Sequence, residues 1–169
     1  IPMVETSEQA QAAVDATRYP PEGKRSGGNF ATSFHGENYF EEANDEIFLS
    51  IQIETALGLN NAKEIMSTKG IDGCWIGPFD LAESLGIPFN SPEHFDAIEH
   101  IINVCKETNK IPGISCGPPN FSTDQWIEKG CLFVTAGNDQ MWMIDGAKNT
   151  IKELQRYWQP NNSATPKSY

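Results

Sequence analysis

Two carboxylates end strand-like apolar runs in this chain, and their positions suggest a bound cation. Glu54 closes the run IFLSIQIET, and Asp80 closes the run GCWIGPFDL. An acid that follows such a run lies where a buried strand emerges from its sheet. In α/β barrels and open parallel sheets, ligand sites are built at that end of the strands. Two acids from successive strands therefore predict a site for a hard divalent cation.

The residues around this pair favour a cation with oxygen ligands. Gln52 and Glu54 have the same parity in their strand, so both side chains are expected on one face. Asp80 follows a Gly-Pro-Phe turn, where the N–H groups of Phe79 and Asp80 are available to hold a carboxylate. No His or Cys lies beside the pair, so the expected metal is Mg²⁺, with Mn²⁺ as a substitute. The alternative interpretation is structural: Glu54 caps a helix and Asp80 closes a turn.

The composition argues against several classes of partner. The 169 residues carry a net charge of −11, which disfavours nucleic acid and anionic membranes because phosphate binding needs clustered Lys and Arg. No apolar span is long enough to cross a bilayer. The four cysteines match no zinc-binding spacing, and their apolar surroundings predict buried free thiols. Free thiols favour a reducing compartment, so a cytoplasmic location is expected.

Strand-like and helical patterns alternate along the chain, which predicts parallel βα units. The strand-like runs are too few for a complete eightfold barrel, which needs roughly 250 residues. We therefore expect an α/β chain that forms the C-terminal part of a single domain over residues 1–157, followed by a flexible tail over 158–169. The predicted strands are 1–4, 47–53, 74–76, 111–115 and 132–135; the predicted helices start near Thr6, Tyr39, Ser91, Thr123 and Met141, with one more ending near Thr68.

Several blocks of the sequence resemble the HpcH/HpaI aldolase family of metal-dependent, pyruvate-forming lyases. The matching blocks, in order, are IPMVET, ATRYPPEGKR, IQIET, GIDGCWIGPFDLAESLG, KIPGIS and FVTAGND. The pairing of Gln-x-Glu with Gly-Pro-x-Asp is specific, and the similarity extends from residue 1 to about residue 145. The resemblance implies a (β/α)8 TIM barrel, of which this chain covers roughly strands 4 to 8.

The resemblance also implies roles for individual residues. Glu54 and Asp80 would bind Mg²⁺, Gln52 would line the substrate pocket, and the Phe79 and Asp80 amides would hold the pyruvate carboxylate. Ser115 ends its strand and would border the pocket for the aldehyde or acceptor. The family's acid/base His and enolate-stabilising Arg would lie upstream of the first residue, so no catalytic residue is assigned within this chain.

Other polar residues have structural interpretations of equal or greater weight. His94 and His100 lie on the helical pattern after Ser91, where surface or partly buried structural roles are expected. His35 lies in a loop. Arg18 and Arg25 flank the RYPP block, and they would either approach an anionic substrate or form structural salt bridges.

The resemblance implies one of two reactions. In the first, oxaloacetate loses CO₂ to give a metal-bound pyruvate enolate that adds to a 2-pyrone and builds a benzoate. In the alternative, a class II aldolase cleaves a 4-hydroxy-2-oxo acid to pyruvate and an aldehyde. A Schiff-base aldolase would need a lysine at the carboxyl end of a strand, whereas Lys110 lies at the wrong end of its strand.

A third hypothesis is a non-catalytic relative that binds a ligand. The expected partners of an enzyme are a small 2-oxo acid and an electrophilic acceptor. The resemblance further implies a homo-oligomer, such as a hexamer that exchanges a C-terminal helix, and the apolar residues of the last predicted helix agree with that.

Overall fold

The computed structural model describes residues 1–28, 30–116, 123–135 and 137–158. They belong to two compact units, one over Ile1–Ala136 and one that begins at Gly137. Helix α9 (Asp139–Gln155) lies in the second unit. The first unit contains the elements α1 (Ser7–Thr17), α2 (Ala31–His35), α3 (Tyr39–Glu46), β1 (Ser50–Ile53), α4 (Ala56–Asn60), α5 (Ala62–Met66), β2 (Gly73–Ile76), α6 (Pro78–Leu85), α7 (Pro92–Glu107), β3 (Ile111–Ile114), α8 (Thr123–Glu128) and β4 (Phe133–Val134).

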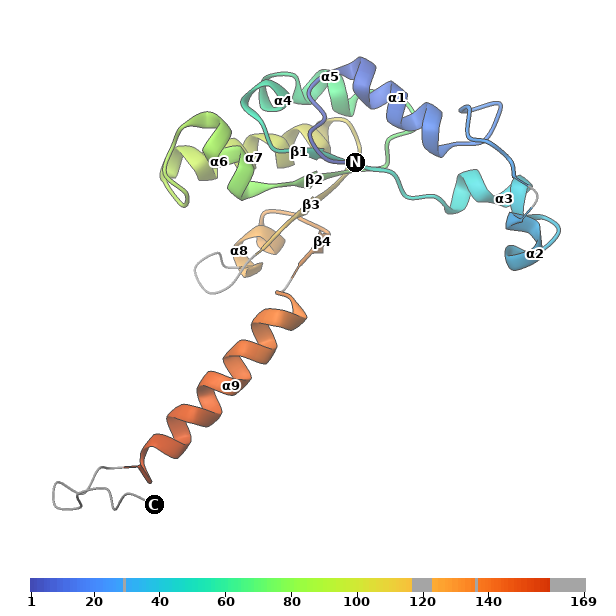
Figure 1. Cartoon of the computed structure of the whole chain (residues 1–169). Helices are drawn as coiled ribbons and strands as arrows, with labels where there is room; N and C mark the ends of the chain where they lie inside the picture. The colour runs from blue at the N-terminus through green and yellow to red at the C-terminus, as the bar shows by residue number, and fades with distance from the viewer. Residues whose placement is uncertain (29, 117–122, 136, 159–169) are drawn as a thin grey trace, which may run out of the picture. The chain divides into compact units, whose positions relative to one another are not determined.

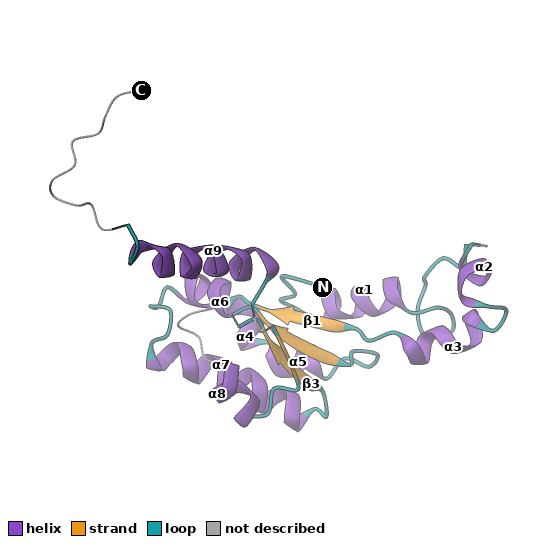
Figure 2. Ribbon diagram, turned by 90° about the horizontal axis from the view of Figure 1, so that it is seen from below, coloured by secondary structure: helices purple, strands orange, loops and turns teal. Residues whose placement is uncertain are grey.

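The described strands form one parallel sheet (Figure 2). Their order in the sheet is β1-β2-β3-β4. Ile53 is paired with Ile76, Ile76 with Ile114, and Ile114 with Val134. Because the strands are parallel and share this register, their carboxyl ends meet along one edge. The residues that follow each strand therefore lie side by side on that edge.

One face of the sheet packs against helices. Ile51, Ile53, Cys74, Ile76 and Ile114 are fully buried. They belong to a single apolar core to which α1, α5 and α7 also contribute. Figure 1 shows these helices beside the sheet. The alternation of buried and half-buried residues along β1 follows from the period of two in a strand.

The opposite face of the sheet carries large side chains that remain partly exposed. The register aligns Trp75 with Gly113 and Gly113 with Phe133. The centroid of the Phe133 ring lies 5.0 Å from that of Trp75 and 5.5 Å from that of Phe48. In a closed barrel this face is the interior, so the arrangement agrees with the predicted part of a barrel.

The predicted strand over residues 1–4 is not a regular strand. Its backbone lies against β1, because the carbonyl of Ile1 accepts from the Gln52 N–H at 2.8 Å and the Val4 N–H donates to the Gln52 carbonyl at 3.3 Å. Met3, between them, has φ of 56°, in the left-handed region that non-glycine residues rarely adopt. This extra residue interrupts the ladder in the manner of a bulge.

Most predicted helix starts agree with the structure. The side chains of Thr6 and Ser91 cap α1 and α7 by accepting a hydrogen bond from the first turn. The predicted helix that ends near Thr68 is divided at Asn61 into α4 and α5. Our sequence patterns do not predict α2 or α6. Helix α6 begins at Pro78, and proline at the first position of a helix is a signal that could have predicted it.

The prediction of buried free thiols is confirmed for Cys74, Cys105, Cys116 and Cys131. Burial raises the pKa of Cys131 to about 12, with a further contribution from the neighbouring thiols of Cys116 and Cys105. These side chains act as small apolar groups in the core.

The second unit is described through α9. Asn138 caps this helix by accepting a hydrogen bond from the Met141 N–H at 2.9 Å, and none of its residues is buried. No described helix is long and apolar enough to cross a membrane. Residues 159–169 of the predicted tail lie outside the described part of the chain.

Candidate functional site

The carboxyl edge of the sheet brings together most of the predicted site residues. Extending the register by one residue aligns Glu54 after β1, Gly77 after β2, Ser115 after β3 and Thr135 after β4. The Ser115 N–H donates to the Ile76 carbonyl at 3.1 Å, which continues the ladder to this row. Side chains of the row project toward the interior face, as parity requires.

Glu54 is a buried carboxylate with two neutral hydrogen-bond donors. The residue is 3% exposed. The Met3 N–H donates to Oε1 at 3.0 Å, and Gln52 Nε2 donates to Oε2 at 2.6 Å. The bond from Gln52 confirms that the two side chains share one face. In the described part of the chain, no Lys, Arg or His forms an ion pair with Glu54.

Asp80 lies in the first turn of α6, on the same edge as Glu54. Gly77 is the N-cap of this helix, and Phe79 and Asp80 are its second and third residues. The N–H groups at these positions have no acceptor within a helix, so the predicted pair of amides is realised as a helix N-terminus. Asp80 is exposed, and Phe79 is 62% exposed.

Gly77 lies in close contact with the side chain of Glu54. A methyl group added to its Cα would lie 2.4 Å from Glu54 Oε2 and 2.9 Å from Gln52 Nε2. The Glu54 side chain therefore packs directly on the N-cap of the helix that carries Asp80. The positive end of the helix dipole favours a carboxylate at this place.

Ser115 is half-buried beyond the end of β3, next to the Gly77 position in the register. On its other side, Thr135 Oγ1 accepts from the Cys116 N–H at 2.9 Å and donates to the Cys116 carbonyl at 3.0 Å. Ser115 thus lies between Gly77 and Thr135 in this row, on the side of the site away from Glu54.

His94, expected as a surface or partly buried residue, is fully buried. Its Nδ1 accepts from the Asn90 N–H at 3.2 Å, so the ring proton is on Nε2, which donates to the Pro78 carbonyl at 2.7 Å. Burial lowers the pKa of His94, and the bond to the Pro78 carbonyl opposes that shift. The sequence gives no signal for this contact, which joins α7 to the first turn of α6.

Arg18 has a structural role at the other end of the sheet. Its guanidinium lies 2.5 Å from Asp72, and it donates to the Gly70 carbonyl at 3.2 Å. Asp72 precedes β2, so this ion pair is at the amino end of the strands. Arg25 lies over the ring of Tyr19, 4.7 Å from the centroid. Of the two alternatives weighed for Arg18, the structural salt bridge is the one observed.

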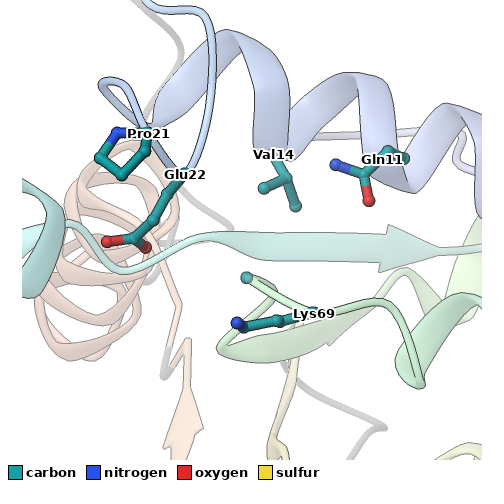
Figure 3. Close-up of a pocket in the computed structure, with 6 residues that line it drawn as sticks. Gln11, Val14, Pro21, Glu22 and Lys69 are labelled. Atoms are coloured by element: carbon teal, nitrogen blue, oxygen red, sulfur yellow. The ribbon is translucent and has the colours of Figure 1, made fainter.

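A cavity of about 380 Å³ also lies at the amino end of β2. Figure 3 shows the helix α1, the loop after it and Lys69 around this cavity, which is lined by Gln11, Val14, Pro21, Glu22, Lys69 and Gly70. None of the predicted site residues lines it. Because enzymes of barrel architecture carry their sites at the carboxyl end, we do not assign the cavity to the candidate site.

The donor set fits a divalent cation with oxygen ligands. A buried anion without a positive partner is costly, and a cation beside Glu54 would supply the missing charge. No group of three or more His, Cys, Asp or Glu side chains suited to a metal occurs within the described ranges. Two carboxylates with further positions left to water and substrate is a ligand set that Mg²⁺ and Mn²⁺ accept.

Comparison with known proteins gives close relatives. 5-Keto-4-deoxy-D-glucarate aldolase from Klebsiella pneumoniae subsp. pneumoniae is 40% identical over 147 residues, which cover 82% of this chain and 56% of the relative. 2-Keto-3-deoxy-L-rhamnonate aldolase from Escherichia coli is 40% identical over 151 residues, which cover 86% of this chain and 56% of the relative. The chain thus spans a little more than half the length of these curated relatives.

Solved structures share the fold. A HpcH/HpaI aldolase/citrate lyase family protein from Burkholderia cenocepacia superimposes with a TM-score of 0.85 at 28% identity, over 92% of this chain and 63% of that one. Macrophomate synthase superimposes with a TM-score of 0.75 at 20% identity, over 94% of this chain and 60% of that one; at this identity the likeness shows the fold alone. The prediction that the chain forms part of a TIM barrel is confirmed. Residues 1–146 match the profile of the HpcH/HpaI aldolase/citrate lyase family, and the chain belongs to this family.

Proposed function

We propose that this chain supplies the metal and 2-oxo acid site of a divalent-metal-dependent aldolase, which cleaves a 4-hydroxy-2-oxo acid to pyruvate and an aldehyde. The observation that carries the proposal is the buried carboxylate of Glu54, which has two neutral donors and packs on the N-cap of α6. Asp80 in the first turn of α6 supplies the second carboxylate. Mg²⁺ is the proposed ion, with Mn²⁺ as a substitute.

Each residue has a distinct task in this proposal. Glu54 and Asp80 hold the cation, which when bound supplies a Lewis acid for the keto oxygen of the substrate. Gln52 fixes the orientation of Glu54 through its hydrogen bond of 2.6 Å and borders the substrate. The N–H groups of Phe79 and Asp80 orient the carboxylate of the 2-oxo acid. Ser115 borders the space for the aldehyde.

The aldolase reaction has better support than condensation of an enolate with a 2-pyrone. The relatives with 40% identity are aldolases of keto-deoxy sugar acids, whereas the likeness to macrophomate synthase is at 20% identity. Oxaloacetate decarboxylation shares the same metal and carboxylate site, so we include it as a second activity to be assayed. If ligands bind without turnover, the chain either is a non-catalytic ligand-binding relative or lacks the acid/base His and Arg that the resemblance places upstream of its first residue. Turnover by a protein that includes that upstream part separates these two outcomes.

The test begins with binding. Mn²⁺ and then pyruvate are titrated into the full chain by calorimetry, and pyruvate is expected to bind only after the metal. Glu54→Gln keeps the shape of the side chain and its contact with Gln52 but removes the charge. Loss of a residue that only supports a metal ligand typically lowers metal affinity about 10–100-fold. Because Glu54 is proposed to bind the metal directly, we expect its replacement to lower Mn²⁺ affinity at least about 100-fold. Glu83→Gln, an exposed change later in α6, is the matched control. Unchanged Mn²⁺ binding by Glu54→Gln would overturn the assignment.

Turnover is assayed in the same preparation. Pyruvate released from 4-hydroxy-2-oxo acids is measured by the NADH-dependent reduction of pyruvate, with EDTA as the control for metal dependence. Parallel reactions contain oxaloacetate alone, and oxaloacetate with a 2-pyrone. Benzoate in the last reaction, without aldehyde from the first, would favour the condensation instead.

We also propose that the chain is a cytoplasmic homo-oligomer. Trp142, Met143, Ile151 and Leu154 of α9 are each more than half exposed, and a second copy of the chain would cover these apolar side chains. The four buried free thiols agree with a reducing compartment. Sedimentation equilibrium measures the mass of the assembly, and a monomer at micromolar concentration would contradict the oligomer.

A further inference from the structure

His94 contacts the backbone of the candidate site from the side of α7. It lies in the first turn of α7, and its ring is fully buried. Because Nδ1 accepts from the Asn90 N–H, Nε2 carries the proton and donates to the carbonyl of Pro78 at 2.7 Å. This bond is distinct from the intrahelical hydrogen bonds of α6, since a carbonyl oxygen has two lone pairs.

The carbonyl of Pro78 and the N–H of Phe79 belong to the same peptide group. The only described cis peptide is Pro20–Pro21, so this peptide is trans, and its C=O and N–H point in opposite directions. A donor that holds the carbonyl from the side of α7 therefore also fixes the direction of the Phe79 N–H. A carbonyl that accepts an additional hydrogen bond makes the N–H of its own peptide a stronger donor.

We propose that His94 is a positioning residue, which aims and strengthens the Phe79 N–H as a donor to the carboxylate of the bound 2-oxo acid. The inference rests on the proposed function, because it needs that carboxylate to lie at the N-terminus of α6. It assigns to a buried side chain on α7 an effect on substrate affinity. Metal affinity should not depend on His94, because His94 contacts neither Glu54 nor Asp80 through any described hydrogen bond.

The test compares three variants of the full chain. His94→Phe keeps a ring of similar size without a donor, and His94→Gln keeps a side-chain N–H that can reach the Pro78 carbonyl. His100→Gln changes an exposed residue of the same helix and is the control. Affinities for Mn²⁺ alone, and for pyruvate with Mn²⁺ present, are measured by calorimetry, and thermal unfolding is recorded for each variant.

We expect His94→Phe to weaken pyruvate binding about three- to tenfold, the range for one hydrogen bond, with Mn²⁺ affinity unchanged within twofold. His94→Gln should recover most of the pyruvate affinity, and His100→Gln should match the parent. A merely structural role would lower the unfolding temperature of both His94 variants without separating them in pyruvate affinity, and that result would overturn the proposal.

A measurement on the parent protein keeps the proposal testable if His94→Phe fails to fold. With Mg²⁺ bound, addition of pyruvate should move the amide resonance of Phe79 and the Nε2–H resonance of His94 together, because the two groups share the Pro78 peptide. If pyruvate binds and neither resonance moves, the positioning role is wrong while the proposed function stands. If the metal-loaded parent does not bind pyruvate at all, the proposed function fails, and the inference fails with it.

Discussion

Replacement of Gly77 by alanine adds one methyl group to the candidate site and so tests the proposed packing of Glu54 there. Gly77 has φ of −94° and ψ of 88°, outside the left-handed region, so alanine introduces no backbone strain and its effect is steric. The added methyl group would lie 2.4 Å from Glu54 Oε2 and 2.9 Å from Gln52 Nε2. Both side chains belong to the arrangement that we propose for metal binding.

The size of the effect follows from these contacts. To recover an ordinary separation of about 3.4 Å, the Glu54 oxygen has to move by about 1 Å. That movement would stretch the hydrogen bonds that hold its two oxygens, of 2.6 Å to Gln52 and 3.0 Å to Met3. Loss of such outer contacts lowers metal affinity about 10–100-fold, and the excess volume lowers the free energy of unfolding by about 1–3 kcal/mol.

Gly73→Ala is the matched control for Gly77→Ala. Gly73 is the first residue of β2, four residues before Gly77 and on the same face. Its methyl group would lie 2.6 Å from the Ile111 carbonyl oxygen and 2.9 Å from Phe48 Cζ, far from the two carboxylates along the strand. We expect a similar loss of stability from this control, with unchanged affinity for Mn²⁺.

Both variants are compared with the parent by urea unfolding and by calorimetric titration of Mn²⁺. If the folded Gly77→Ala protein binds Mn²⁺ as tightly as the parent, the packing of Glu54 on the N-cap of α6 is irrelevant to the metal. If Gly73→Ala weakens Mn²⁺ binding equally, the effect comes from the sheet as a whole, and the local argument is refuted.

Two further predictions concern the scaffold. Arg18→Met removes one partner of the ion pair with Asp72 and is expected to lower the free energy of unfolding by about 2–4 kcal/mol, below the range for a fully buried pair because Asp72 is 34% exposed. Arg25→Met should lower it by no more than about 1 kcal/mol, and equal losses in urea titrations would contradict the assigned roles. Cys131, whose pKa is raised to about 12, should not react with a disulfide reagent at pH 8 until the protein unfolds; mass-mapped labelling of the native protein within minutes would contradict its burial.

The sequence allows the strand ends to be predicted because an apolar run gives way there to a charged residue. Glu54 directly follows the last paired residue of β1, and Asp80 falls within four residues of the end of β2. The caps at Thr6 and Ser91 are likewise local, since each needs only a hydroxyl side chain before a helical pattern. Periodicity and capping depend only on residues that are close together in the sequence, so both can be recognised from a single sequence.

The contacts that complete the site are not local. Met3 donates to Glu54 across 51 positions in the sequence, and it does so because its backbone leaves the regular strand at a positive φ that no pattern of residue types specifies. His94 reaches the Pro78 carbonyl from the next helix, and the same pattern of residues would place a histidine on the surface equally well. Such contacts depend on how helices and strands pack against one another, and the sequence pattern does not predict that packing.

The layer of side chains below the candidate site is largely aromatic, which bears on the strength of charge interactions there. On the interior face, Trp75 lies two residues before Gly77 in the same strand, about 7 Å lower, and its ring packs against that of Phe133, which in turn packs against Phe48. These half-exposed rings form an apolar floor one layer below Gly77 and Ser115, and Gln52 is the residue below Glu54 in that layer. Charge interactions are stronger beside a medium of low polarity than in water, so the cation proposed at Glu54 would be screened less on the side of these rings than on the side of open water. The glycine at position 77 leaves room for the carboxylate above this floor, and a larger side chain there would occupy the same space.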